Sequence, residues 1–156
     1  MPDEIERKFL VIGDAWRVGS KGLRYVQGYL SRDPERIVRV RMAGEKAFLT
    51  IKGISQGISR KEFEYALPPA DVEALLELCA GPLIEKTRTR VEYHGKRWEV
   101  DEFAGDNFGL VVAEIELLSK DEPFDLPPWA GRDVSDDRRY YNSCLSERPF
   151  KTWDLP

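Results

Sequence analysis

Seven short segments of this 156-residue chain place charged residues at every second position. Successive side chains of a β-strand point to opposite faces, so each charged set would project from one face while the other face stays largely apolar. A merely solvated face is usually mixed with Thr, Ser, Gln and Asn, whereas these positions hold almost only Glu, Asp, Lys and Arg. They comprise eight acids and eight bases: Glu4, Glu6, Glu62, Glu64, Glu99, Asp101, Glu114 and Glu116, with Lys8, Arg39, Arg41, Lys52, Arg60, Lys86, Arg88 and Arg90.

One alternating strand is typical of any sheet with one wet face. Seven together favour strands that curl into a barrel with the charged face inward. An unpaired ionised group in such an interior costs on the order of tens of kcal/mol of solvation, so this lumen implies a ligand. Carboxylate clusters suit hard divalent cations, and Lys and Arg clusters suit phosphate oxygens. Both sets on one surface indicate a metal-bound polyphosphate.

The motif Glu4-Ile5-Glu6-Arg7-Lys8 resembles the E-x-E-x-K signature of the CYTH superfamily, the triphosphate tunnel metalloenzymes. Further motifs similar to those of the family follow in order: Arg39-Val40-Arg41, Lys52, Arg60-Lys61-Glu62-Phe63-Glu64, Glu85-Lys86-Thr87-Arg88, Glu99-Val100-Asp101, Glu114-Ile115-Glu116 and Asp137-Arg138-Arg139-Tyr140. The resemblance covers about Glu4 to Asn142. It implies an α+β fold, an eight-stranded antiparallel β-barrel with flanking helices that binds triphosphate and a divalent metal inside.

The same resemblance implies metal-dependent hydrolysis of inorganic triphosphate to pyrophosphate and phosphate, with Mg²⁺ or Mn²⁺. Phosphoryl transfer needs mainly positioning and charge neutralisation. The expected substrate-binding residues are Lys8, Arg39, Arg41, Lys52, Arg60, Arg88 and Arg139. The expected metal-binding residues are Glu4, Glu6, Glu62, Glu64, Asp101, Glu114 and Glu116, and which of them contact metal directly stays open. Lys86 is the candidate catalytic residue because a lysine in a crowded cationic site can have a depressed pKa, although it could equally be one more phosphate clamp.

Three other functions stay open. Relatives of this family include class IV adenylate cyclases and thiamine triphosphatases, in which the tunnel holds a triphosphate that carries an organic group. No local motif specifies a purine, and Tyr29, Phe48 or Trp129 could stack a base, although core packing is the commoner fate of such residues. A non-enzymatic polyphosphate-binding module would keep the basic residues and have little need for seven carboxylates.

Length and composition predict a single domain over residues 1–156. A formal net charge of −4 and a pI of about 5.2 argue against a nucleic-acid partner. Two cysteines, Cys79 and Cys144, make a disulfide framework unexpected. No apolar run is long enough for a membrane span and the N-terminus lacks a signal-peptide pattern, so we expect a cytoplasmic protein without a membrane partner. A second copy of the chain as a partner stays open.

Two helices and one tight turn are expected between the strands. Asp71 to Cys79 has apolar residues at helical spacing and would cover the exterior of the barrel. A second helix would run from Ser135 to about Glu147 and close or line an opening of the tunnel, or else simply pack on the surface. Tyr93-His94-Gly95-Lys96 predicts a hairpin turn, which leaves His94, the single histidine, without a catalytic role.

Overall fold

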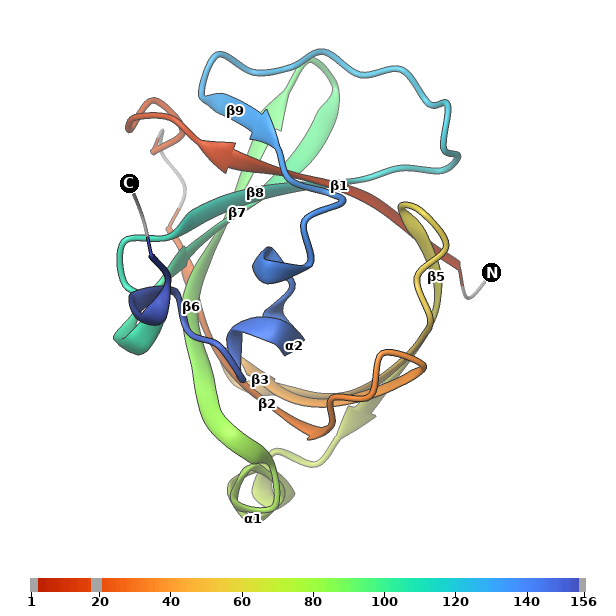
Figure 1. Ribbon diagram of the computed structural model, residues 1–156, viewed down its shortest axis with the longest axis vertical. Coiled ribbons are helices and arrows are strands. Elements are labelled where there is room, and N and C mark those ends of the chain that lie inside the picture. The colour runs from red at the N-terminus through yellow and green to blue at the C-terminus, as the bar shows by residue number, and fades with distance from the viewer. Residues whose placement is uncertain (1–2, 18–20, 155–156) are drawn as a thin grey trace.

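The structure is a computed structural model that describes residues 3–17 and 21–154. Eight antiparallel strands close into a barrel, and a ninth strand lies against its outside (Figure 1). The barrel strands are β1 (Asp3–Val11), β2 (Leu23–Ser31), β3 (Arg36–Ala43), β4 (Lys46–Gly53), β5 (Ser59–Leu67), β6 (Ala80–Tyr93), β7 (Lys96–Phe103) and β8 (Val111–Glu116). Their order around the wall is β5-β4-β3-β2-β6-β7-β8-β1, and β1 pairs with β5 to close the ring.

The predicted barrel class is confirmed, and all seven charged segments lie in its strands. Strand β1 makes the closure by changing partners along its length. Asp3 to Ile5 pair with β5, whereas Glu6 to Leu10 pair with β8. The additional strand β9 (Ala130–Asp133) pairs with the C-terminal part of β1.

The predicted hairpin turn between β6 and β7 is confirmed. Tyr93 pairs with Lys96, which leaves His94 and Gly95 as a two-residue connection. Both have positive φ, 47° and 77°, as the type I′ turns favoured between antiparallel strands require. His94 is therefore a turn residue, and its ring stacks on Tyr93 at the surface.

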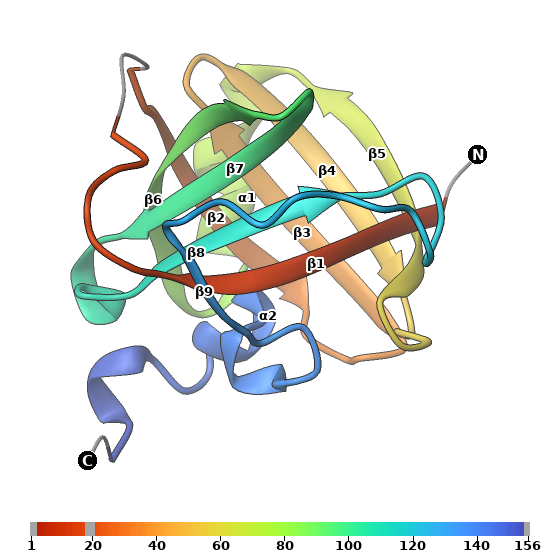
Figure 2. The same cartoon turned by 90° about the horizontal axis from the view of Figure 1, so that it is seen from above.

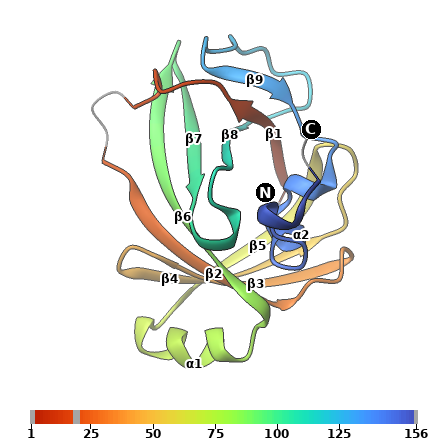
Figure 3. The same ribbon diagram turned by 60° about the vertical axis from the view of Figure 1, so that its left-hand side comes forward.

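The apolar faces of the strands point outward and are covered by other segments. Phe9, Trp98 and Ile115 pack with Trp129 beneath the chain that leads into β9. On another side of the barrel, Val72 of helix α1 (Val72–Glu77) packs on β3 and β4. Figure 3 shows α1 outside the barrel wall, as predicted for the Asp71–Cys79 segment. Much of the hydrophobic core thus lies around the barrel, which leaves the interior for polar groups.

One end of the interior is apolar. Ile84, Phe103 and Val112 each lie two residues from a charged lumen position on the same strand, so they point inward in the next layer. They form a buried cluster with Tyr140 and Leu145 of the C-terminal segment. Figures 1 and 2 together show this segment across one end of the barrel. That end of the tunnel is closed.

The prediction of one helix from Ser135 to Glu147 is wrong. The segment contains a 3₁₀ turn, Arg138–Tyr140, and a separate four-residue helix, α2 (Asn142–Leu145), with Tyr141 in extended conformation between them. The Ser135 hydroxyl accepts a hydrogen bond from the backbone N–H of Lys8 at 2.9 Å instead of capping a helix. Asp137 caps the 3₁₀ turn by accepting from the backbone N–H of Arg139. Only short helical pieces form, because this segment makes contacts with the barrel strands in place of the hydrogen bonds of one continuous helix.

Three short 3₁₀ turns complete the secondary structure: Pro69–Asp71 before α1, Gly105–Asn107 after β7 and Phe150–Thr152 near the C-terminus. None of the helices in the described part of the chain has the length and apolar character that a membrane-spanning helix needs. Both cysteines are free thiols.

Candidate functional site

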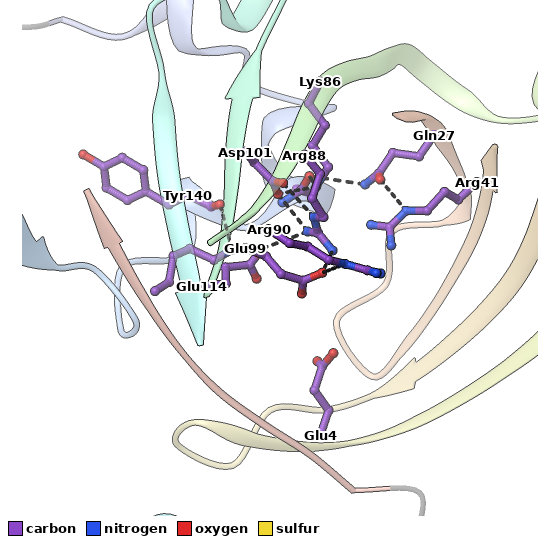
Figure 4. Close-up of polar contacts among 12 residues, drawn as sticks. Glu4, Gln27, Arg41, Lys86, Arg88, Arg90, Glu99, Asp101, Glu114 and Tyr140 are labelled. Carbon is purple, nitrogen blue, oxygen red and sulfur yellow. Dashed lines mark hydrogen bonds and ion pairs between the residues drawn. The ribbon is translucent and has the colours of Figure 1, made fainter. Parts of the chain in front are cut away.

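A charged cavity of about 230 Å³ lies inside the barrel. Figure 4 shows acidic and basic side chains converging on it from several strands. Its walls contain the following residues: Glu4, Glu6, Lys8, Tyr25, Tyr29, Ile37, Arg39, Arg41, Lys52, Arg60, Glu62, Glu64, Lys86, Arg88, Arg90, Glu99, Glu114, Glu116, Asn142 and Ser143. The lining is almost entirely polar, so the cavity suits a highly charged ligand.

Acids and bases occupy opposite halves of the wall. Strands β7, β8, β1 and β5 are consecutive neighbours around the barrel and contribute seven glutamates: Glu99, Glu114, Glu116, Glu4, Glu6, Glu62 and Glu64. Strands β4, β3, β2 and β6 are also consecutive and contribute six bases: Lys52, Arg39, Arg41, Lys86, Arg88 and Arg90. Lys8 and Arg60 are the two bases on the acidic half. A ligand in the cavity therefore has cationic groups on one side and carboxylates on the other.

Several cations of the basic half keep donor capacity for an anion. Arg41 donates from Nε to the Gln27 Oε1 at 2.8 Å and forms no ion pair with any described carboxylate. Burial, together with the neighbouring Arg39 and Arg88, lowers the pKa of Arg41 to about 9. Arg39 is held by the Thr50 hydroxyl at 3.1 Å, yet its buried Nε has no hydrogen-bond partner among the described residues. An unpaired buried donor is costly, so this arrangement suits a bound anion.

Lys8 has a similar surplus of donors. Its Nζ donates to the backbone carbonyl of Tyr140 at 3.2 Å and lies over the Tyr141 ring at 5.4 Å. Neither partner is a carboxylate. Lys8 thus faces the cavity as a cation that a phosphate oxygen could neutralise.

On the acidic half, carboxylates face one another in pairs. Glu4 and Glu62 share a hydrogen bond, and burial and this contact raise the pKa of Glu62 to about 7. Burial and the neighbouring Glu114 raise the pKa of Glu6 well above its ordinary value. Burial also opposes ionisation of Glu4, but Lys52, at 3.1 Å, and Arg60 hold its pKa well below its usual range. In each pair, one carboxyl group, that of Glu6 or Glu62, therefore keeps its proton to a higher pH than usual, unless a cation takes the place of that proton.

This behaviour fits a site for a divalent cation. Carboxylate oxygens are the preferred ligands of Mg²⁺, which binds through one or two carboxylates together with waters and substrate phosphates. Within residues 3–17 and 21–154, no three His, Cys, Asp or Glu side chains converge into a ready-made metal cage. The donor set therefore fits a cation that is shared with a phosphate ligand better than one held by protein alone.

A buried ionic network links Lys86 to the rest of the basic half (Figure 4). The Lys86 Nζ donates to Asp101 at 2.8 Å, and Arg88 donates to both Asp101 oxygens at 2.7 and 2.8 Å. Burial lowers the pKa of Lys86 to about 7, and Arg88 and Arg41 act in the same direction against the opposing effect of Asp101. Lys86 can therefore lose its proton near neutral pH.

The structure brings together thirteen of the fifteen predicted site residues. They are Glu4, Glu6, Lys8, Arg39, Arg41, Lys52, Arg60, Glu62, Glu64, Lys86, Arg88, Glu114 and Glu116. Asp101 lies behind the cavity wall with a side chain 1% exposed, and both of its oxygens are taken by Lys86 and Arg88. Its position is that of a residue that orients those two cations, not of a metal ligand.

Arg139 lies away from the cavity. Its side chain is 57% exposed, pairs with Asp137 at 2.6 Å and stacks over the Trp153 ring at 5.0 Å. The expectation that it binds substrate is not met by this arrangement, because the 3₁₀ turn directs it outward. Near this turn, the basic residue that faces the cavity is Lys8, whose Nζ donates to the carbonyl of Tyr140, the residue after Arg139.

Sequence reasoning missed the neutral polar residues of the site. Gln27, which has no exposed surface, and Tyr25 come from β2, the barrel strand without alternating charge. Thr50, also without exposed surface, links Arg39 to Glu64 by accepting from the first and donating to the second, each at 3.1 Å. Asn142 of α2 lines the cavity beyond the strands. The parity of Thr50 with Lys52 was a usable signal, whereas the expectation that residues 135–147 close or line an opening of the tunnel did not single out Asn142.

The stacking alternatives are settled in part by burial. Trp129 packs in the exterior cluster beside Trp98, with ring centroids 5.6 Å apart, so it is a core residue. Tyr29 lines the cavity, but it is only 3% exposed and accepts a hydrogen bond from Gln27 at 3.1 Å. Neither presents a free aromatic face to a base.

Comparison with known proteins yields a consistent set of relatives. The CYTH domain family matches residues 2–143. An inorganic triphosphatase of Acetivibrio thermocellus is 49% identical over 154 residues, which are 98% of this chain and 99% of the relative. An inorganic triphosphatase of Nitrosomonas europaea is 37% identical over 92% of this chain and 96% of its own length.

Solved structures show the same relationship. A crystal structure described as an inorganic triphosphatase has a TM-score of 0.66 and 35% identity, and the match covers 92% of this chain and 93% of that one. A protein from Hippeastrum, described as an adenylyl cyclase candidate with a dominant triphosphatase activity, has a TM-score of 0.60 at 15% identity, over 74% of this chain and 80% of that one. At that identity the second similarity supports the fold alone.

Proposed function

Because the chain belongs to the CYTH domain family, we propose that it hydrolyses inorganic triphosphate to pyrophosphate and phosphate inside the barrel. The observation that carries the proposal is the division of the cavity wall into a basic half and an acidic half. A polyphosphate chain would lie along the basic half, and the carboxylates of the acidic half would hold a divalent cation that neutralises part of its charge. The relatives named as inorganic triphosphatases support the same reaction.

The phosphate chain is bound by cations that carboxylates neutralise least: Arg41 and Lys8 form no ion pair with a described carboxylate, and Arg39 contacts only Glu64, at 3.7 Å. Arg39 and Arg41 provide planar guanidinium forks for two-point contacts with phosphate oxygens, and the unpaired Nε of Arg39 supports this role. Lys8 reaches the same cavity from β1. Lys52, Arg60 and Arg88 are already ion-paired, so they hold the carboxylates in place as well as adding positive potential.

Mg²⁺ or Mn²⁺ is the proposed cofactor. Glu4, Glu6, Glu62, Glu64, Glu114 and Glu116 form the set of residues that would hold it. When bound, the cation neutralises phosphate charge and lowers the pKa of a coordinated water. The raised pKa values of Glu6 and Glu62 support this assignment, because a bound cation would take the place of the proton that each of them otherwise keeps.

Lys86 is the proposed base or orienting group for the attacking water. It lies at the cavity wall with a pKa lowered to about 7, so a neutral amine is accessible at physiological pH. The amine accepts a proton from the water while the oxygen of that water forms a bond to the terminal phosphorus. The P–O bond to the rest of the chain breaks, and pyrophosphate leaves with its electrons. Asp101 holds the Lys86 Nζ at the wall during this step.

The dimensions of the site favour a small inorganic substrate over a nucleotide. The cavity of about 230 Å³ is smaller than the ~300–1,000 Å³ typical of pockets for drug-sized molecules. It is closed at one end by the apolar layer beneath α2. An organic triphosphate could enter only with its organic group outside the opposite mouth.

A substrate panel tests the proposal. Purified protein is assayed with Mg²⁺ or Mn²⁺ on inorganic triphosphate, ATP and thiamine triphosphate, and phosphate, pyrophosphate and cyclic AMP are measured. We expect metal-dependent release of phosphate and pyrophosphate from triphosphate, with kcat/KM at least tenfold above that for the organic substrates. Cyclic AMP from ATP, or equal activity without a divalent metal, would overturn it.

A further inference from the structure

A single amide side chain of the C-terminal segment connects two parts of the basic half. The Oδ1 atom of Asn142 accepts hydrogen bonds from the Lys86 Nζ at 2.9 Å and from the Gln27 Nε2 at 3.2 Å. Gln27 and Lys86 come from adjacent strands, β2 and β6, and share no hydrogen bond of their own among the described contacts. Asn142 thus joins them from the segment that closes one end of the cavity.

Gln27 extends this connection to Arg41, one of the proposed phosphate-binding residues. Its Oε1 accepts from the Arg41 Nε at 2.8 Å, while its Nε2 donates to the Tyr29 hydroxyl and to Asn142. Because both amide hydrogens are used and the side chain has no exposed surface, its orientation is fixed. On the other side, Lys86 continues through Asp101 to Arg88. A continuous chain of polar contacts therefore runs from Arg41 through Asn142 to Arg88.

The position of Asn142 is set by residues 138–146, the cap, which closes one end of the barrel. Leu145, three residues further along α2, has no exposed surface and packs against Ile84, which lies two residues from Lys86 on β6. The preceding Tyr140 carbonyl accepts from Lys8. Apolar and polar contacts thus anchor the cap to the strands that carry the charged residues. They fix the position of Asn142 relative to Lys86 and Gln27.

We propose that Asn142 is a positioning residue that fixes Lys86 and, through Gln27, Arg41 in the geometry that hydrolysis requires. This inference rests on the proposed triphosphatase function of the same cavity. Without the Asn142 oxygen, the Lys86 Nζ keeps Asp101 as its partner but loses the contact that holds it against the cap. Arg41 keeps Gln27, whose amide then has one hydrogen bond fewer, to Tyr29 alone from its Nε2, and holds Arg41 less firmly.

A double-mutant cycle tests the proposal. Asn142→Ala is expected to lower kcat on triphosphate at least tenfold, since Lys86 is displaced, and to raise KM severalfold because Arg41 is held less firmly. Gln27→Leu is expected to raise KM more than it lowers kcat. The kcat/KM of the double variant should be no more than about twofold below that of the more impaired single variant, because both substitutions break the same chain of polar contacts.

Ser146→Ala is the matched control for the stability of the cap. The Ser146 hydroxyl donates to the backbone carbonyl of Ser143 at 2.8 Å, within the same segment, and forms no hydrogen bond with a side chain of the cavity wall among the described contacts. This variant should lower Tm while kcat and KM of the folded protein stay within twofold of wild type. A kcat within twofold of wild type for Asn142→Ala, or effects of Asn142→Ala and Gln27→Leu that multiply in full, would refute the positioning role.

A substrate-free measurement separates this inference from the proposed function. In thermal denaturation, the Tm decrease of the double variant should be clearly smaller than the sum of the two single decreases. Fully additive decreases would overturn the connection whatever the reaction. Wild-type protein that does not hydrolyse triphosphate would instead refute the proposed function, while non-additive Tm shifts would still support the link between Asn142 and Gln27.

Discussion

Arg41 shows how one residue combines the two requirements of this site. It is 8% exposed, its Nε is bound to Gln27, and no described carboxylate neutralises it. A buried guanidinium without a counter-ion is unfavourable on its own, as its pKa of about 9 reflects. An anion bound in the cavity would supply the missing counter-charge.

Replacement of Arg41 with alanine should weaken triphosphate binding. Loss of a charge-assisted hydrogen bond costs about 1.5–3 kcal/mol, or roughly 10- to 100-fold in Kd. Titration calorimetry with triphosphate and Mg²⁺ measures the change. Arg7→Ala is the matched control, since Arg7 points outward from β1 and pairs with Asp133 at 3.1 Å. Equal affinities of the Arg41 and Arg7 variants would contradict the clamp assignment.

Glu62 predicts a pH-dependent stability of the metal-free protein. Its pKa is raised to about 7 by burial and by the contact with Glu4, so the folded state holds a proton that the unfolded state releases nearer its ordinary value of 4.5. Stability is therefore lost as pH rises from about 4.5 to 7. Glu62→Gln removes this loss, so its Tm relative to wild type should increase between pH 4.5 and pH 8.

Thermal denaturation in the presence of a chelator at several pH values measures this effect. Addition of Mg²⁺ at pH 8 should stabilise the wild type more than the Glu62→Gln variant, because the carboxylate is then needed as a ligand. A Tm difference between variant and wild type that does not change with pH would show that Glu62 titrates normally and that the pair shares no proton.

At the scale of elements, the charged strands were predictable, whereas closure of one tunnel end by residues 135–147 was expected only as one of two alternatives and the conformation of this segment was not predicted. Alternation of Glu4, Glu6 and Lys8 has a period of two that no helix reproduces, so the strand and its inward face followed from the sequence. The segment around Asn142 has no such constraint, because its conformation depends on contacts of Ser135 and Leu145 with strands far away in the sequence. Local propensity favoured one helix, and these tertiary contacts broke it in two.

The same distinction explains the site residues. Thirteen were predictable because charge at alternate positions identifies the inward face of each strand. Arg139 was misplaced, since its direction depends on the 3₁₀ turn and on the Asp137 contact. Gln27 was missed because β2 has no charged alternation, although its residues point into the same cavity.

The cap itself can be tested with Leu145→Ala. Truncation of a fully buried leucine costs about 2–5 kcal/mol and should loosen α2 from the apolar layer. We expect a lower Tm, faster amide exchange in residues 138–146 and a reduced kcat of the folded fraction. Val72→Ala, in the buried contact between α1 and the barrel exterior, should reduce Tm without altering kcat. Unchanged kcat in the Leu145 variant would mean that the cap serves stability alone.

The whole molecule reverses the usual distribution of polar and apolar groups. Hydrophobic clusters surround the barrel and fill one end, while the interior holds opposed half-walls of bases and acids. Closure of the ring through the short β1 and β5 pairing brings Glu4 beside Arg60 and completes the acidic half. A single closed barrel thereby creates one site from all eight of its strands, which no smaller part of the chain could form.

The most direct test of this arrangement is a crystal structure of the protein with triphosphate and Mn²⁺, in which anomalous scattering locates the metal. The account predicts phosphate oxygens within hydrogen-bond distance of Arg39 and Arg41, and Mn²⁺ between the phosphates and the glutamates of β1, β5 and β8. Triphosphate and Mn²⁺ bound on the outer surface, with the cavity filled only by water, would contradict it.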